Sequence, residues 1–308
     1  MNYTLRHTTR YHYSAPVTLC HSEARVLPRK TQHQQCGASE LTISPMPHVQ
    51  AERRDVFGNR VLYFAMEEVH QTLDVTVVTP LNTQPLGPLP ASSPSWENVA
   101  AQLRQDSRFD MQLYRLDSPF IRRNDELADF ARTCFTPGRP LVEAAMALNQ
   151  TIYDTFEYDP SFTTLATPLS DVLANRRGVC QDFAHLAIGA LRSVGLPARY
   201  VSGYLETQPP PGQPRLIGAD ASHAWLAVWI PDWGWLALDP TNGTLAGEQH
   251  PVLAWGRDYA DVAPLKGVMN GGGEHQLEVE VDVSCRSPST ASPEPPALAV
   301  SGTPASQR

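Results

Sequence analysis

Lysine is almost absent from this sequence. Only Lys30 and Lys266 stand among its 24 basic residues, and the 308 residues carry a formal net charge of −8. A protein that binds the phosphate backbone of nucleic acid needs clustered cationic side chains, and the sequence contains no cationic tract. We therefore expect no nucleic-acid partner.

Long hydrophobic runs are also missing. No stretch approaches the ~20 apolar residues that a membrane-spanning helix requires, and the first residues, Met1–His7, lack the apolar core of a signal peptide. The sequence therefore predicts a cytoplasmic protein without a membrane partner.

Paired cysteines are a third absence. The number of cysteines is odd, and they are scattered without a Cys-x-x-Cys pair, which fits neither a disulfide framework nor a zinc knuckle. A glycine run at residues 271–273 lacks the flanks and the lysine of a phosphate loop. We expect reduced thiols, no bound metal and no nucleotide. The cysteines are Cys20, Cys36, Cys134, Cys180 and Cys285.

The length of the chain favours two domains. Aromatic and β-branched residues alternate in Tyr3–Tyr13 and Leu73–Val78, and Gly58-Asn59 has the composition of a hairpin turn. These signals predict an antiparallel, sandwich-like β-domain over residues 1–80. Residues 81–95 are rich in proline and indicate a linker.

The rest of the sequence is typical of an α+β catalytic domain over residues 96–285. Helical patterns come first, and strand patterns follow at 198–205, 222–230, 235–239 and 275–283. We expect the apolar face of the last strand to pack on the sheet that holds the preceding hairpin. Thr207–Pro214 is expected to form an exposed loop above a cleft, and residues 286–308 a disordered tail.

One predicted helix begins at a cysteine. Gly178 permits a tight entry, and apolar or small residues then recur at the spacing of one helical face, from Cys180 through Phe183 and Ala187. Free amides in the first turn and the helix dipole favour the thiolate form of Cys180, which is the nucleophilic form. Taken alone, the same pattern suits a small buried side chain equally well.

A hairpin predicted from Ser222 to Asp239 carries two further polar residues. His223 lies eight residues before Pro231, and Asp239 lies five residues after Gly234. Antiparallel pairing brings Asp239 back toward His223, and a bulge or diagonal contact has to absorb the three-residue difference. Taken singly, His223 is explained as an edge-strand residue and Asp239 as the start of an Asp-Pro turn.

Together the three residues make a candidate catalytic set. Cys180 would attack an amide carbonyl, His223 would carry the proton, and Asp239 would orient the imidazole. The backbone N–H of Cys180 could serve as one oxyanion donor. His185 lies five positions after Cys180 and is poorly aligned with it, so we assign it a structural hydrogen bond. A metal site of Cys180, His185 and His223 lacks a fourth ligand and is not expected.

These segments resemble the bacterial transglutaminase-like superfamily. The similarity rests on Gly178–Leu186, Gly195–Tyr204, His223–Trp225 and Trp235–Thr241, and Arg6–Tyr11 with Asp55–Asn59 is similar to the β-rich region that precedes this core in one bacterial branch. The resemblance implies a papain-like fold with helices packed on an antiparallel sheet. It also implies that Cys180, His223 and Asp239 correspond to the family's triad, with no metal or organic cofactor.

The resemblance leaves the reaction open, because an acyl-enzyme can be resolved by water or by an amine. Our preferred hypothesis is hydrolysis of a peptide or isopeptide amide, with a peptide or protein as substrate. The alternatives are acyl transfer from a glutamine side chain to an amine, and a non-catalytic binding module on the same fold.

Overall fold

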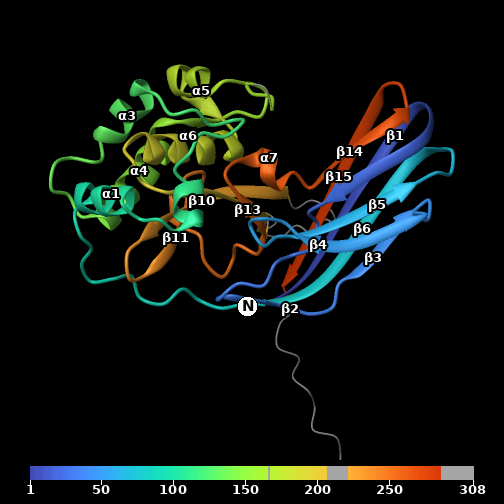
Figure 1. Ribbon diagram of the computed structural model, residues 1–308, viewed down its shortest axis with the longest axis horizontal. Helices are drawn as coiled ribbons and strands as arrows, with labels where there is room; N and C mark the ends of the chain where they lie inside the picture. Colours follow the sequence, from blue (N-terminus) through green and yellow to red (C-terminus); the bar gives the residue numbers. More distant parts are fainter. Residues whose placement is uncertain (166, 207–220, 286–308) are drawn as a thin grey trace, which may run out of the picture.

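The computed structural model describes residues 1–165, 167–206 and 221–285. Figure 1 shows helices gathered around one sheet, with a second, larger sheet beside it. This arrangement confirms the predicted α+β class with a β-rich N-terminal region. The expected loop over Thr207–Pro214 and the expected tail over residues 286–308 lie outside the described residues.

The larger sheet is organised around its first strand, β1 (Asn2–Ala24). The first half of β1 lies between β6 and β15, and the second half lies between β5 and β14. Strands β2 and β3 extend β6, and β4 extends β5. The bounds are β2 (Gln34–Cys36), β3 (Glu40–Ser44), β4 (Val49–Arg54), β5 (Arg60–Met66), β6 (His70–Thr83), β14 (Leu265–Gly271) and β15 (His275–Cys285).

The final strand belongs to the larger sheet and packs on the smaller one. Residues 275–283 form a strand, and β15 pairs with β1, with Val283 opposite Leu5. Its buried residues Val281 and Val283 pack against Tyr204 and Leu253 of the smaller sheet. Alternation of apolar residues shows that one face of a strand is buried and says nothing of which sheet buries it. The predicted packing of its apolar face on the hairpin sheet is confirmed by the cluster of these valines with Tyr204 and Leu253. The hydrogen bonds of β15 nevertheless belong to the larger sheet, which therefore contains strands from both sides of the predicted 1–80 limit.

Helices begin after residues 84–95, which form neither a helix nor an extended strand. The side chain of Asn124 accepts the N–H of Leu127 at 2.8 Å, as expected of a helix cap, whereas the side chain of Ser95 makes no such bond. The helices are α1 (Trp96–Arg104), α2 (Phe109–Leu113), α3 (Asp125–Arg132), α4 (Leu141–Thr155), α5 (Leu169–Asn175), α6 (Cys180–Ser193) and α7 (Tyr259–Val262). No helix in the described part of the chain is long and apolar enough to span a membrane.

The smaller sheet has the strand order β12-β11-β10-β9-β13. Helix α6 covers one face, where Ala224, Leu226 and Val228 join the main core, and the next residues along the strand, Trp225 and Ala227, point to the other face. A short parallel pair, β7 (Glu157–Tyr158) and β8 (Arg177–Gly178), leads into α6. The five strands are β9 (Ala198–Leu205), β10 (Ala221–Ile230), β11 (Gly234–Asp239), β12 (Thr244–Leu245) and β13 (Val252–Gly256).

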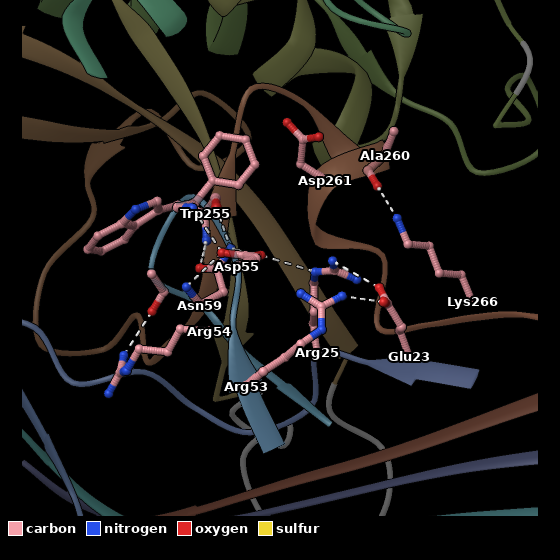
Figure 2. A network of polar contacts seen from close by, with 12 residues as sticks. Glu23, Arg25, Arg53, Arg54, Asp55, Asn59, Trp255, Ala260, Asp261 and Lys266 are labelled. Atoms are coloured by element: carbon pink, nitrogen blue, oxygen red, sulfur yellow. Dashed lines mark hydrogen bonds and ion pairs between the residues drawn. The ribbon is translucent and has the colours of Figure 1, made fainter. Parts of the chain in front are cut away.

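Two amide side chains of the N-terminal region pair with β13 as a neighbouring strand would. Asn59 accepts the N–H of Trp255 at 3.0 Å and donates to its carbonyl at 2.8 Å, and Gln34 does the same for Val252 at 2.8 and 2.7 Å. Figure 2 shows the contacts that Asn59 makes with Asp55 and Trp255. These four bonds satisfy backbone groups of β13 that a sheet edge would leave open.

Candidate active site

Cys180 is the first residue of α6, and the side chain of Asp182 fixes the turn before it. One carboxylate oxygen of Asp182 accepts the N–H of Val179 at 2.9 Å, and a Cβ on residue 178 would lie 2.9 Å from that oxygen. Gly178 is therefore required by the close approach of Asp182. Burial raises the pKa of Asp182, against the effect of this hydrogen bond. The sequence indicated the tight entry but not this carboxylate.

His223 and Asp239 lie on neighbouring strands of the hairpin. Leu226 pairs with Leu238, so the next pair along would put Asp239 opposite Trp225, and His223 follows two residues further on the same face. A diagonal contact thus absorbs the predicted three-residue difference. Nε2 of His223 lies 2.8 Å from Oδ2 of Asp239.

The imidazole of His223 contacts both of the other predicted residues. Since its Nε2 faces Asp239, its Nδ1 is the ring nitrogen left to interact with Cys180, whose side chain helps to raise the pKa of the ring. Burial alone would lower the pKa of His223, but the hydrogen bonds and charges of Asp239 and Cys180 outweigh it and raise this pKa to about 10. At neutral pH the ring is therefore an imidazolium.

Asp239 is fully buried and accepts five hydrogen bonds. Its Oδ2 accepts from His223, from Nε2 of His250 at 3.1 Å and from Nδ2 of Asn242 at 2.7 Å. Its Oδ1 accepts the backbone N–H groups of Thr241 at 3.0 Å and Asn242 at 3.3 Å. Burial would raise the pKa of Asp239, but these donors hold it below its usual range, so the side chain is a carboxylate.

His250 is a member of this site that the sequence did not reveal. The N–H of Gly247 donates to its Nδ1 at 3.2 Å, so the ring hydrogen of the neutral imidazole lies on Nε2 and points at Asp239. Its ring also meets Trp225 edge to face, with centroids 5.3 Å apart. His250 precedes Pro251 in a segment without a periodic pattern, and no motif or spacing connects it to the hairpin.

His185 has the structural role predicted for it. Its Nε2 accepts the N–H of Tyr259 at 3.1 Å, its ring stacks on Phe120, and burial lowers its pKa to about 3. Among the described residues, the side chains close enough to share a metal ion are His223, Asp239 and His250, with their ligand atoms within 4.8 Å of one another. The hydrogen bonds among these three already account for their approach.

Comparisons with known proteins identify the family of this chain. Residues 3–80 match the bacterial transglutaminase-like N-terminal region, and residues 128–240, which contain Cys180, His223 and Asp239, match the transglutaminase-like superfamily. An uncharacterized protein of Mycobacterium tuberculosis (strain H37Rv) is 42% identical over 290 residues, which are 91% of this chain and 92% of that protein. The chain belongs to the transglutaminase-like superfamily.

Two further proteins differ in how much of this chain they resemble. A crystal structure of a candidate cysteine protease from Cytophaga hutchinsonii superposes with a TM-score of 0.70 at 22% identity, covering 93% of this chain and 92% of that one. A protein-glutamine gamma-glutamyltransferase of Pseudomonas aeruginosa is 30% identical over 184 residues, which are 56% of this chain but 26% of that enzyme. The first shares the fold of nearly the whole chain, whereas the second shares a part.

Proposed function

We propose that this protein is a cysteine-dependent amide hydrolase in which Cys180, His223 and Asp239 form the catalytic triad. The observation that carries the proposal is the position of the His223 ring, which is hydrogen-bonded through Nε2 to a buried carboxylate and lies close enough to Cys180 for that side chain to raise the pKa of the ring. A thiol nucleophile, a base and an orienting group in this order are the parts that acyl transfer requires.

The electrostatics of the site support an imidazolium beside the sulfur as the resting state. His223 is protonated at neutral pH because its pKa is raised to about 10, and Cys180 lies at the positive end of α6. The thiolate would attack the substrate carbonyl and form a tetrahedral oxyanion. His223 would then give its proton to the leaving amine as the C–N bond breaks, which leaves an acyl-enzyme.

Water would complete the hydrolysis. Neutral His223 would take a proton from the attacking water, the C–S bond would break, and the acid product would leave with the thiolate restored. The backbone N–H of Cys180, in the first turn of α6, is one donor for the oxyanion, and such a donor is worth about 2.7–4 kcal/mol.

Acyl transfer to an amine is the second candidate function. It is favoured by the similarity to the Pseudomonas gamma-glutamyltransferase, which covers part of the core. The chemistry of the first half-reaction is identical, since a glutamine carboxamide would release ammonia and leave the same thioester. The difference lies in whether an amine or water attacks that thioester.

A single assay separates these functions. The full chain is incubated with a glutamine-containing peptide, with and without excess primary amine. Cleaved peptide, or ammonia without amine incorporation, supports the hydrolase, and incorporation supports the transferase. We expect Cys180→Ala to abolish either activity and leave thermal stability nearly unchanged, while Cys285→Ser, which removes an exposed thiol elsewhere, retains it.

A non-catalytic protein would behave differently in a simpler experiment. Iodoacetamide at neutral pH should label Cys180 faster than the other four cysteines, because the other thiols lack an imidazolium partner in the described structure. Equal or slower labelling of Cys180, together with no activity on any peptide, would leave the binding module as the better hypothesis.

A further inference from the structure

A cavity of about 850 Å³ lies between loops of the N-terminal region and the face of the smaller sheet that α6 does not cover. Its lining includes His33, Phe57 and Gln84 from the N-terminal side, and none of Cys180, His223 and Asp239. The volume is in the range of small-molecule sites. The cavity therefore adjoins the proposed catalytic centre through His250, which lines it and donates to Asp239, but it contains none of the three proposed catalytic side chains.

Indole rings form the side of the cavity that the smaller sheet provides. Trp225 and Trp229 reach it from β10, because alternate residues of a strand share one face, and Trp235 and Trp255 reach it from β11 and β13. With Trp233, five of the six tryptophans of the chain line this one space. A ligand there should therefore change most of the intrinsic fluorescence of the protein.

Arg199 supplies a positive charge in this aromatic wall. Its guanidinium carbon lies 3.7 Å from the centroid of the Trp255 ring and 4.3 Å from that of Trp235. Its Nε is buried without a hydrogen-bond partner, and no carboxylate of the described residues forms an ion pair with it. Burial lowers the pKa of Arg199 to about 9, which still leaves a cation at neutral pH. A stacked guanidinium of this kind offers its free N–H groups to a planar anion.

We propose that this cavity binds a small aromatic monocarboxylate, with its ring among the tryptophans and its carboxylate on Arg199. An apolar ring suits the indole wall, and a carboxylate would satisfy the donors that Arg199 leaves open. Two other lining residues, Asp110 and Asp232, are exposed carboxylates. They would repel a polyanion, and for this reason the proposal is limited to a single negative charge.

The test uses 2-naphthoate as the probe and tryptophan fluorescence as the readout, on the full chain. We expect saturable binding that is at least about tenfold tighter than that of the neutral analogue 2-naphthylmethanol, because a hydrogen bond to a charged group is worth at least that factor. Arg199→Gln should weaken 2-naphthoate by about tenfold to a hundredfold and leave the neutral analogue unchanged.

Arg108→Gln is the matched control. Arg108 also lies over a tryptophan ring, 5.3 Å from the centroid of Trp229, but it does not line the cavity. The Arg108→Gln protein should bind 2-naphthoate with the affinity of the unaltered protein. Should Arg199→Gln fail to fold, Ala237→Phe, which places a ring in the lining, should reduce binding of both probes.

Three results would overturn the proposal: no saturable binding, equal affinity for the acid and the alcohol, or undiminished binding to the folded Arg199→Gln protein. The test is independent of the proposed function, because binding is measured equally well in Cys180→Ala. Loss of hydrolysis with retained naphthoate binding would leave the cavity proposal intact.

Discussion

Replacing Asp239 by asparagine tests the hydrogen-bond arrangement around His223 directly. The carboxylate accepts three donors on Oδ2 and two on Oδ1. An asparagine has one oxygen and one NH₂ group, so in either orientation the NH₂ faces groups that are themselves donors. If the amide oxygen takes the place of Oδ1, the NH₂ group faces His223, His250 and Asn242. If the oxygen takes the place of Oδ2, the NH₂ group faces two backbone N–H groups.

The loss can be estimated from the number of donors left without an acceptor. His223 can adapt by moving its hydrogen to Nδ1, but His250 cannot, because its Nδ1 already accepts from Gly247. Asn242 is exposed, so its amide can bond to water. At least one buried donor, the Nε2–H of His250, therefore loses its acceptor, at a cost of about 1–3 kcal/mol of unfolding free energy.

The reactivity of the thiol should fall as well. A neutral His223 with its hydrogen on Nδ1 would present that hydrogen to the sulfur and could not accept a proton from it. An ordinary thiol is only about 3% thiolate at pH 7, so the rate of Cys180 alkylation should fall by up to about 30-fold. Loss of turnover should be larger, since the corresponding change in a serine protease triad costs ~10⁴ in rate.

The assays are urea unfolding, followed by fluorescence, and the second-order rate of iodoacetamide labelling at pH 7. Asp232→Asn is the control, because it makes the same chemical change in the exposed turn of the same hairpin, at a φ of 61° that asparagine tolerates. An Asp239→Asn protein with the unfolding free energy and the labelling rate of the wild type would refute the reasoning, since the five hydrogen bonds would then contribute neither to stability nor to the reactivity of Cys180.

Three further outcomes are expected. His250→Phe should lower the Cys180 labelling rate and cost about 1.5–3 kcal/mol in urea unfolding, whereas His250→Gln, which keeps a donor, should recover most of both. Burial lowers the pKa of His7 to about 4 and of His185 to about 3, so the unfolded chain binds protons below pH 6.5 that the folded chain does not. The free energy of unfolding should therefore fall by about 2 kcal/mol for each of these histidines at pH 5. A urea midpoint that stays constant from pH 6.5 to 5 would contradict this. Asn59→Ala should cost about 2–4 kcal/mol in the same assay, because it leaves both backbone groups of Trp255 without a partner. Asn82→Ala, which removes hydrogen bonds that are exposed to solvent, should change the stability little.

The sequence predicted best what local patterns determine. The helix that begins at Cys180 and the hairpin that carries His223 and Asp239 follow from periodicity, glycine and turn composition, and the resemblance to a family linked them. The partner of the last strand and the position of His250 could not be predicted, because both depend on contacts between segments far apart in the chain. Val283 meets Leu5, and His250 meets Asp239, through tertiary packing that leaves no trace in residue spacing.

The contacts of β13 explain how the N-terminal region can support the site without contributing a residue to it. Gln34 and Asn59 hold the two ends of β13, and His250 comes two residues before that strand. The carbonyl of Pro251 accepts the N–H of Tyr204, and a Cβ on Gly203 would lie 2.2 Å from the same oxygen. The segment around His250 is therefore fixed from both sides. Since His250 in turn donates to Asp239, the N-terminal β-region and the catalytic core should lose order at the site together.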